Sequence, residues 1–280
     1  MMVELAINEF PQVLSLYAAS EGRFPLISAV IQGKQRGQIF ADKREAPRFA
    51  LVVSDFGFTL AFGAFDSQAV KEVFEVLGHA SLLKPRYLLW YHPPAAWQHL
   101  LDRLVPVRVR RRTRIRLNFL EDRALWLGQP VILPPGYSCE PLSRELIPRI
   151  EKFGVQIGSR FWSSVDDFLS RGFGACVIGD GEVRSLCYAA VVIDGLAEID
   201  VATEQSFRGH GLATLATQCF IRECILRGVL PTWDCFDYNA GSLKLALKLG
   251  FEKALTYPFY SFELPLECDS LLSVSSTRTA

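Results

Sequence analysis

The chain has 280 residues, of which half are apolar and 12% are aromatic, so it is long enough for two domains with a core each. Lysine and arginine together total 30, as do aspartate and glutamate. The formal charge therefore cancels, which excludes a global field that would recruit nucleic acid or an anionic membrane.

The seven cysteines form no C-x-x-C pair, and most are flanked by apolar residues. This pattern is typical of small buried side chains in a reducing compartment. The four histidines lack partners at metal-ligand spacing, so we expect no metal site. No basic and apolar leader opens the sequence, and the most hydrophobic stretch, 49–65, is interrupted by Asp55 and two glycines. We therefore expect a cytoplasmic protein that does not enter a membrane.

The first half of the chain mixes helical and strand patterns. Apolar residues at helical spacing predict helices at 10–19, 25–31 and 68–77. Runs rich in β-branched and aromatic residues predict strands at 38–40, 49–53, 58–62, 87–90 and 107–119. No glycine-rich loop leads into a helix in this half. By its own pattern it is an α/β or α+β domain without an identifiable site.

Four prolines between residues 128 and 141 mark the sharpest change in composition. We expect the domain boundary there, with one domain at 1–130 and a second at 131–265. The remaining residues, 266–280, are rich in serine and threonine and have no apolar pattern. A disordered tail is expected for them.

The second half has a sharper order of elements. Strands are predicted at 137–140, 174–178 and 183–193, with a hairpin turn at 179–181. They are followed by a strand at 196–203, a helix at 209–227, a strand at 232–236, a helix at 240–249 and a strand at 251–262. Such alternation predicts one mixed sheet covered by helices, an α/β (α+β) fold.

The most informative segment joins the strand at 196–203 to the helix that follows it. Its loop, RGHG at 208–211, precedes a helical pattern that begins at Leu212. Small residues let an anion approach backbone N–H groups, and a helix N-terminus carries unpaired N–H groups with a partial positive charge. The segment therefore predicts a phosphate site to which Arg208 adds a charged contact. The alternative is a glycine-rich loop that only turns the chain tightly.

Two motifs in this half resemble those of a known family. The stretch 208–213, RGHGLA, matches the acyl-CoA signature of the GNAT acetyltransferases, Arg/Gln-x-x-Gly-x-Gly/Ala, at every defined position. The stretch 239–251 resembles the family's Asn-x-x-Ser…Gly-Phe element. The sequence from 231 to 251 is most similar to a bacterial subgroup that includes proteins resembling the zwittermicin A resistance acetyltransferase. In that subgroup a degenerate α/β domain precedes the GNAT domain, as residues 1–130 would here.

The resemblance implies an acyl-coenzyme A site. Acetyl-CoA would be the acetyl donor, and no metal would be needed. Backbone groups near Val201 and Thr203 are expected to pair with the pantetheine arm and to face the thioester oxygen. The residues expected to contact the coenzyme are Val201, Thr203, Arg208, Gly209, His210, Gly211, Leu212, Ala213, Thr214, Asn239 and Ser242. Ser242 lies in the first turn of its helix, so capping that helix is the alternative role.

Acetyl transfer to an amine needs a base that takes the amine proton, an N–H donor for the oxyanion, and a proton for the departing thiolate. Glu198 is the first candidate for the base, because many GNAT enzymes carry an acid on the strand before the phosphate turn. Asp200 has the same side-chain parity and is the second candidate. The alternative is that both carboxylates are solvated or paired with an arginine.

The tyrosine that GNAT enzymes commonly use as the acid is absent, since Ala246 stands at that position. Tyr238, Tyr257, Tyr260 and Cys235 are near in sequence, but each is more typical of a packing residue. The acid is therefore unassigned, and coenzyme A can also leave as a thiolate.

Six arginines occur in the nine residues from Arg108 to Arg116. In an extended strand five of them share one face. Such a face could bind the phosphates of a nucleic acid or an acidic substrate. The alternative, which the zero net charge favours, is a charged strand paired with acids such as Glu121 and Asp122 or with those of the other domain.

These features predict an acetyl-CoA-dependent N-acetyltransferase whose acceptor is a small-molecule amine, with a protein amine as the alternative acceptor. The alternative is a non-catalytic acyl-CoA-binding protein with a regulatory or interaction role, which the missing tyrosine supports. The acceptor pocket is expected to involve residues 153–170 and part of the first half. A nucleic-acid partner is the remote third alternative, and a homodimer is left open.

Overall fold

A computed structural model gives the fold and describes residues 1–20, 24–79, 81–91, 93–102 and 109–264. The chain forms two compact units. Unit 1 comprises residues 1–113 and the segment that begins at Tyr257, and unit 2 comprises residues 114–256. The expected tail at 266–280 and the start of the strand expected at 107–119, Arg108 included, lie outside the described residues.

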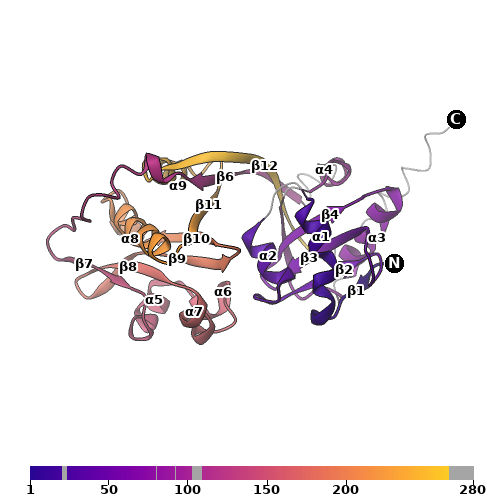
Figure 1. Ribbon diagram of the computed structural model, residues 1–280, viewed down its shortest axis with the longest axis horizontal. Helices are drawn as coiled ribbons and strands as arrows, with labels where there is room; N and C mark the ends of the chain where they lie inside the picture. Colours follow the sequence, from indigo (N-terminus) through magenta and orange to yellow (C-terminus); the bar gives the residue numbers. More distant parts are fainter. Residues whose placement is uncertain (21–23, 80, 92, 103–108, 265–280) are drawn as a thin grey trace. The chain divides into compact units, whose positions relative to one another are not determined.

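Unit 1 contains a mostly antiparallel sheet (Figure 1). Its strands lie in the order β1-β2-β3-β4-β5-β12, and among the described pairings β4 with β5 is the parallel one. The strands are β1 (Val3–Glu4), β2 (Gly37–Ala41), β3 (Phe49–Ser54), β4 (Phe58–Gly63), β5 (Tyr87–Tyr91) and the end of β12 (Phe251–Glu263). The helices are a 3-10 helix η1 (Ile7–Val13), α1 (Leu14–Ala18), α2 (Pro25–Ile31), α3 (Ser67–Gly78) and α4 (Ala95–Asp102).

The local sequence explains the central elements of unit 1. All six residues of β3 are buried, as expected of a near-continuous apolar strand whose two faces are both covered. All seven residues of α2 are buried as well, and Pro25 occupies its first turn, where a missing N–H costs nothing. Helix α3 buries Val73, Phe74 and Leu77 on one side, and they join Trp90 and Trp97 in the core.

In unit 2 the strands lie in the order β6-β11-β10-β9-β8-β7, with β10 and β11 parallel. These strands are β6 (Val109–Phe119), β7 (Tyr137–Pro141), β8 (Gly174–Gly179), β9 (Glu182–Ile193), β10 (Leu196–Thr203) and β11 (Leu230–Phe236). The helices are α5 (Ile147–Phe153), α6 (Ile157–Arg160), α7 (Val165–Arg171), α8 (Leu212–Leu226) and α9 (Ala240–Lys248). Short 3-10 helices are η2 (Glu121–Arg123), η3 (Arg144–Leu146) and η4 (Gln205–Phe207).

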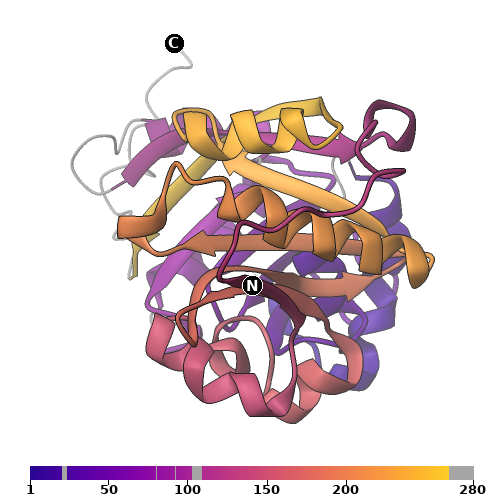
Figure 2. The same ribbon diagram turned by 90° about the vertical axis from the view of Figure 1, so that its left-hand side faces the viewer.

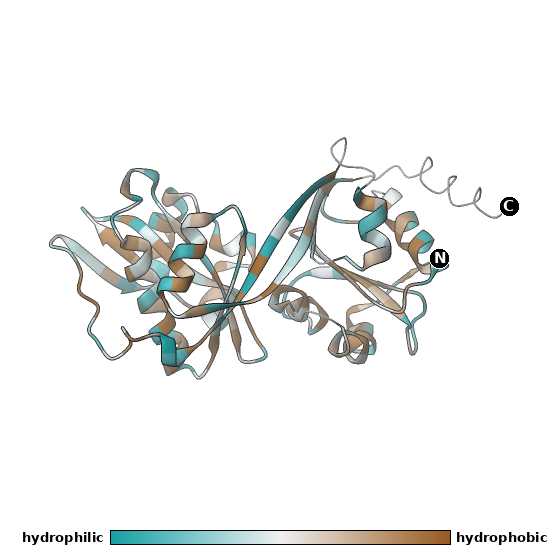
Figure 3. Cartoon of the chain, turned by 90° about the horizontal axis from the view of Figure 1, so that it is seen from above, coloured by the Kyte–Doolittle hydropathy of each residue, from teal (hydrophilic) through white to brown (hydrophobic). Residues whose placement is uncertain are grey.

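Helices cover both faces of the unit 2 sheet. Helix α8 lies on one face, and α5, α6 and α7 lie on the other (Figures 1 and 2). On the α8 side, Phe220 stacks on Phe173 with their ring centroids 5.0 Å apart. On the opposite side, the indole N–H of Trp162 donates to the carbonyl of Ala189 at 2.9 Å. Strand β6 alternates polar residues with apolar ones such as Leu117, which join the α8 side of the core (Figure 3).

The two units repeat one order of elements. In unit 1 the chain runs β4–α3–β5–α4 and continues into β6, and in unit 2 it runs β10–α8–β11–α9 and continues into β12. The final strands are exchanged: β6 pairs with β11 in unit 2 from Arg114 onward, and β12 pairs with β5 in unit 1. The division therefore differs from the expected boundary near residue 130. Residues 114–130 belong to unit 2, and the strand after Thr256 returns to unit 1.

The elements that the sequence predicts are found, and the mixed α/β fold class is confirmed. Asp180 and Gly181 have φ values of +53° and +73°, as the expected tight hairpin requires. The helix expected from residue 209 begins at Leu212, because Gly209 and Gly211 both have positive φ. The helix expected at 10–19 is a 3-10 helix followed by α1, with Pro11 inside the 3-10 segment. The sequence patterns missed β1, α4 and the helices α5, α6 and α7 within residues 147–171.

Candidate active site

An opening in the unit 2 sheet begins where β10 and β11 separate. These parallel strands pair at Leu196, Ala197 and Glu198, which lie opposite residues 230–232. The register of β10 against β9 shifts between Glu198 and Ile199, as in a β-bulge. The extra residue lies on β9, because Glu198 is opposite Val191 and Ile199 is opposite Ala189. Such a bulge disrupts the ladder locally and strengthens the twist at the point where the pairing of β10 with β11 ends. The edge of β10 from Ile199 to Thr203 is therefore open toward the gap.

The loop after β10 leads to the N-terminus of α8 at this opening. Gly209 and Gly211 have φ values of +83° and +80°, which favour glycine. A Cβ at either position would meet no atom within 4 Å, so the backbone there is bare. Gly211 is the N-cap residue of α8, and no side chain caps the helix. The first N–H groups of α8 are thus not satisfied within the helix and can receive an anion.

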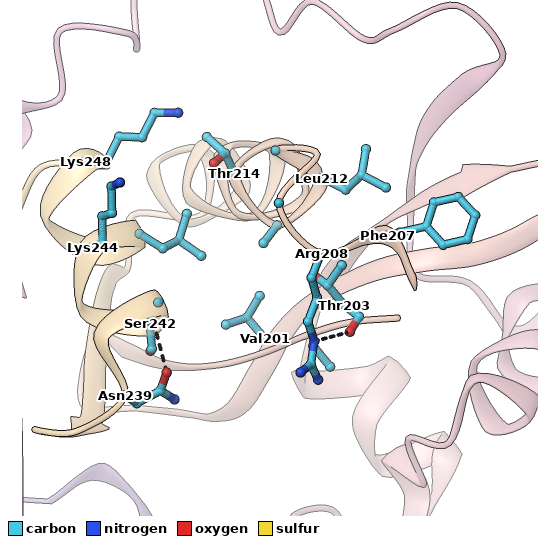
Figure 4. A pocket seen from close by; sticks show the side chains of 16 residues that line it. Val201, Thr203, Phe207, Arg208, Leu212, Thr214, Asn239, Ser242, Lys244 and Lys248 are labelled. Atoms are coloured by element: carbon cyan, nitrogen blue, oxygen red, sulfur yellow. Dashed lines mark hydrogen bonds between the residues drawn. The ribbon is translucent and has the colours of Figure 1, made fainter. Parts of the chain in front are cut away.

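A cavity of about 680 Å³ lies between β10, α8 and α9 (Figure 4). Ten of the eleven residues expected at the coenzyme site line it: Val201, Thr203, Arg208, Gly209, Gly211, Leu212, Ala213, Thr214, Asn239 and Ser242. His210 does not line it; its ring lies edge-on to Phe207, with the ring centroids 6.3 Å apart.

Arg208 lies on one side of the cavity, and Lys244 and Lys248 of α9 lie on the other (Figure 4). The Nε of Arg208 donates to the carbonyl of Thr203 at 3.3 Å. The other nitrogens of this exposed guanidinium take no part in that bond. The two lysines were missed in the sequence. Their spacing of four residues puts them on one helix face, which is the signal that could have found them.

Helix α9 brings the two remaining polar residues to the cavity. The side chain of Asn239 caps α9 by accepting from the backbone N–H of Ser242 at 3.1 Å. The hydroxyl of Ser242 accepts from the indole N–H of Trp233 at 2.9 Å. The capping role considered for Ser242 therefore belongs to Asn239, and Ser242 fixes the end of α9 against β11.

Glu198 lies on β10 at the point where the strands separate and is only 6% exposed. Burial raises the pKa of its carboxyl to about 7, although the nearby Arg116 guanidinium favours the charged form. Its Oε2 has no hydrogen-bond partner among the described residues. Thr232 of β11 is its register partner, and the Thr232 hydroxyl is also buried without a partner in the described part of the chain. The two polar groups face the same side of the sheet.

Asp200 has a different environment, although it lies on the same strand. Its Oδ2 accepts from the hydroxyl of Tyr188 at 2.8 Å and lies 3.2 Å from Nη1 of Arg160. The alternative of an arginine-paired carboxylate therefore holds for Asp200. Glu198, in contrast, keeps a carboxylate oxygen that the described residues leave unbound.

The arginines of β6 form ion pairs. Nε of Arg114 lies 2.5 Å from one carboxylate oxygen of Asp234, and Nη2 of Arg116 lies 3.3 Å from the other. In unit 1, Arg111 lies 3.5 Å from Asp102. The interpretation as a charged strand paired with acids is confirmed for these arginines. The acids are Asp102 and Asp234 rather than residues 121 and 122. Asp234 is a carboxylate of the second expected domain, and it lies beside the arginines because β6 pairs with β11.

Comparison with known proteins identifies this arrangement. A family model described as GNAT acetyltransferase matches residues 19–260. The chain belongs to the GNAT acetyltransferase family. It is 34% identical over 128 residues to "Uncharacterized N-acetyltransferase YdfB" of Bacillus subtilis (strain 168). That match covers 46% of this chain and 49% of the relative, so it spans about half the length of the curated relative.

Solved structures share the GNAT fold over nearly the whole chain. A GCN5-related N-acetyltransferase-like protein from Streptococcus suis 89/1591 is 24% identical with a TM-score of 0.69, covering 91% of this chain and 99% of that one. A tandem GNAT protein from the clavulanic acid biosynthesis pathway is 13% identical with a TM-score of 0.67, covering 94% and 98%. At these identities the likeness concerns the fold.

This GNAT chain has no tyrosine at the usual position of the acid. Ala246 is fully buried in the core of unit 2. Tyr238 is exposed and stacks on Phe236, and burial raises the pKa of the Cys235 thiol. Tyr257 belongs to unit 1 together with Tyr260, whose hydroxyl donates to Asp102 at 2.7 Å. The residues suggested from the sequence therefore supply no acid within the cavity.

The described residues contain neither a helix that could cross a membrane nor a group of side chains that could hold a metal ion. None of the helices there combines the length and the apolar character that crossing a bilayer requires. No three or more His, Cys, Asp and Glu side chains in that part of the chain are grouped so that they could hold a metal ion.

Proposed function

We propose that this GNAT protein transfers an acetyl group from acetyl-CoA to the amine of a small molecule. The observation that carries the proposal is the uncapped N-terminus of α8, which opens into a 680 Å³ cavity beside the open edge of β10. That volume lies within the usual range for small-molecule sites, about 300–1,000 Å³.

The phosphate end of the proposed site has donors and positive charge. The bare N–H groups at the start of α8 would bind the pyrophosphate of the coenzyme, as helix N-termini commonly bind anions. Arg208, Lys244 and Lys248 line the same cavity and would neutralise the phosphates. Because each lysine carries a flexible point charge, we expect them to contribute more to affinity than to orientation.

The open edge of β10 would bind the pantetheine arm. Beyond Glu198 the described ladder between β10 and β11 ends, so backbone N–H and C=O groups near Val201 and Thr203 can pair with an extended ligand. An N–H of this segment would then donate to the oxygen of the tetrahedral intermediate. Cavity residues Leu212 and Leu245 would contact the apolar part of the arm.

Glu198 would act as the base. With a pKa of about 7, a substantial part of its carboxyl groups is ionised near neutral pH, yet each remains basic enough to accept a proton. The amine nitrogen forms the new C–N bond and loses its proton to Glu198, directly or through a water that the Thr232 hydroxyl could hold. When the C–S bond breaks, its electron pair goes to sulfur, which leaves as a thiolate because Ala246 has no proton to give.

The acceptor is proposed to be a small molecule that approaches from the face opposite α8. The carboxylates of Glu198 and Asp200 lie on that face, and α6 provides Arg160 at its border. The ionised form of Glu198 would attract a cationic amine. Membership of the two-domain subgroup that resembles the zwittermicin A resistance acetyltransferase is part of the same proposal.

Titration of the full chain with acetyl-CoA and with free coenzyme A tests the donor site. We expect saturable binding of both by calorimetry, and the absence of heat with either ligand would contradict the proposal. Release of coenzyme A thiol with a panel of small-molecule amines then tests transfer. Hydrolysis in the absence of an amine is the blank.

A non-catalytic acyl-CoA-binding protein is the second candidate function, and the buried Ala246 favours it. The two functions differ in one measurable respect. If acetyl-CoA binds but no amine accelerates thiol release above the blank, the binding role replaces the catalytic one. A nucleic-acid role has no such support, because Asp234 already neutralises part of the charge of Arg114 and Arg116.

A further inference from the structure

Unit 1 contains a cavity of its own, of about 820 Å³. It lies at the end of β4, beside α1 and the start of α4. Most of the lining residues come from these segments and the loops beside them, and Arg48 comes from the residue before β3. The lining is mostly apolar, with Leu60, Phe62, Phe65, Pro93 and Pro94 the larger apolar residues. The proposed transfer reaction does not involve this cavity.

The unit 1 cavity occupies the counterpart of the coenzyme cavity in unit 2. Strands β4 and β5 are parallel and pair at two positions only in the described ladder, Phe58 with Leu89 and Thr59 with Trp90. Strands β10 and β11 separate in the same way after three paired positions. In both units the cavity lies beyond the paired rows, between the first strand of the parallel pair and the helix that follows the second.

The chemistry of the two cavities differs at the helix that follows the first strand. Helix α3 is capped by the carboxylate of Asp66, which accepts from the N–H of Ala69 at 2.8 Å. This negative charge occupies the position at which the bare N-terminus of α8 would bind an anion. A Cβ at Gly63 would lie 2.3 Å from the carbonyl oxygen of Arg48, so the backbone before α3 is closely packed rather than open. Unit 1 therefore lacks a phosphate site at this place.

The cation and the amide of the unit 1 cavity are already engaged. Arg48 donates to the carboxylate of Asp42 through its Nε at 3.1 Å and through its backbone N–H at 2.8 Å. The amide nitrogen of Gln98 donates to the carbonyl of Pro93 at 2.8 Å. Because Asp42 offsets the charge of Arg48, the cavity attracts an anion only weakly, whereas an apolar ligand would cover the surfaces of the leucine, phenylalanine and proline side chains.

We propose that the unit 1 cavity is a second ligand site, which takes an uncharged and largely apolar small molecule and excludes coenzyme A. The parallel strands β4 and β5 of unit 1 have the same arrangement as β10 and β11 at the transferase site. The N-terminus of α3, however, is capped by the carboxylate of Asp66. Acetyl-CoA should therefore bind once per chain, and an apolar ligand should bind at a separate place.

The neutral fluorescent probe N-phenyl-1-naphthylamine tests the site in the full chain. We expect saturable fluorescence enhancement with one equivalent per chain, unchanged when acetyl-CoA is present. Ala64 and Ala95 are exposed lining residues, so Ala64→Trp and Ala95→Trp should each fill the cavity and weaken probe binding at least about tenfold. Ala18→Trp places the same side chain on an exposed position of α1 outside the lining and should leave probe binding as in the wild type.

Circular dichroism and acetyl-CoA titration of each variant show whether it is folded, and Ala95→Trp serves if Ala64→Trp fails to fold. Probe binding that is absent, that acetyl-CoA displaces, or that both filling variants retain would overturn the proposal. So would a second equivalent of acetyl-CoA that disappears in the filling variants. Because probe binding is measured without catalysis, loss of the transferase hypothesis would not alter this result.

Discussion

Replacing Glu198 with glutamine is the most direct test of the proposed chemistry. The substitution keeps the shape of the side chain and removes the carboxylate that would accept the amine proton. General-base catalysis typically contributes about 10²–10⁴-fold, so we expect kcat to fall by a factor in that range at pH 8. Glu198 does not line the coenzyme cavity, and the Kd for acetyl-CoA should therefore change by less than about twofold.

The pH dependence of the wild type follows from the burial of Glu198. With a pKa of about 7, half of the carboxyl groups are ionised at that pH. Each pH unit below it lowers the ionised fraction by about tenfold. The value of kcat/KM should therefore rise up to about pH 7 and then level off on account of this group, and the E198Q variant should lack that rise.

Thiol release measured from pH 5.5 to 9 gives both the loss of kcat in E198Q and the pH dependence of kcat/KM in the wild type. Asp200→Asn is the matched control. The Asp200 carboxylate is already bound to Tyr188 and Arg160, so we expect this variant to lose less than about tenfold. Turnover by E198Q equal to that of the wild type would refute the role of Glu198 as base. A wild-type profile that does not rise between pH 5.5 and 7 would refute the argument from burial.

Gly211→Ala should raise the Kd for acetyl-CoA at least about tenfold by shielding the helix end, whereas Gly228→Ala, with a similar positive φ and open surroundings at the other end of α8, should not. Calorimetry decides, and equal affinities would contradict the phosphate site. Asp234→Ala should lower the free energy of unfolding by about 3–5 kcal/mol, because it leaves two nearly buried guanidinium groups without their carboxylate partner. Asp166→Ala removes one partner of an exposed ion pair and should lower the free energy of unfolding by less than about 1 kcal/mol. Denaturant unfolding checks this, and similar costs would be evidence against it. Since the folded pKa of Glu198, about 7, lies above the ordinary 4.5, the protonated form is favoured by folding, and stability is lost as pH rises. Relative to E198Q, the wild type should lose about 3 kcal/mol between pH 4 and pH 8, and parallel pH profiles of unfolding for the two proteins would contradict the shift.

The sequence was sufficient for the elements whose pattern is local. The turn at 208–211 and the helix after it could be predicted, because glycine spacing and apolar periodicity act over a few residues. The sequence could not decide between Glu198 and Asp200 as the base, because the two side chains point to the same face of the strand. What separates them is the burial of the first and the partners that the second finds on β9 and α6.

Contacts between residues that are far apart in the sequence could not be predicted from the local pattern. The partner of Arg114, Asp234, lies 120 residues away, so no spacing rule connects them. The same holds for the opposition of Glu198 and Thr232 across β10 and β11. The proline-rich stretch near residue 130 is a real change in composition, but the units divide instead where strands find their partners.

The exchange of β6 and β12 affects how the protein can be made. The ribosome synthesises residue 113 long before Tyr257. Strand β5 can therefore pair with β12 only after almost the whole polypeptide has been translated. During that interval an unpaired strand edge is exposed to other chains. A gene divided at the proline-rich joint would give two products that each hold a strand the other needs, and neither would close its sheet alone.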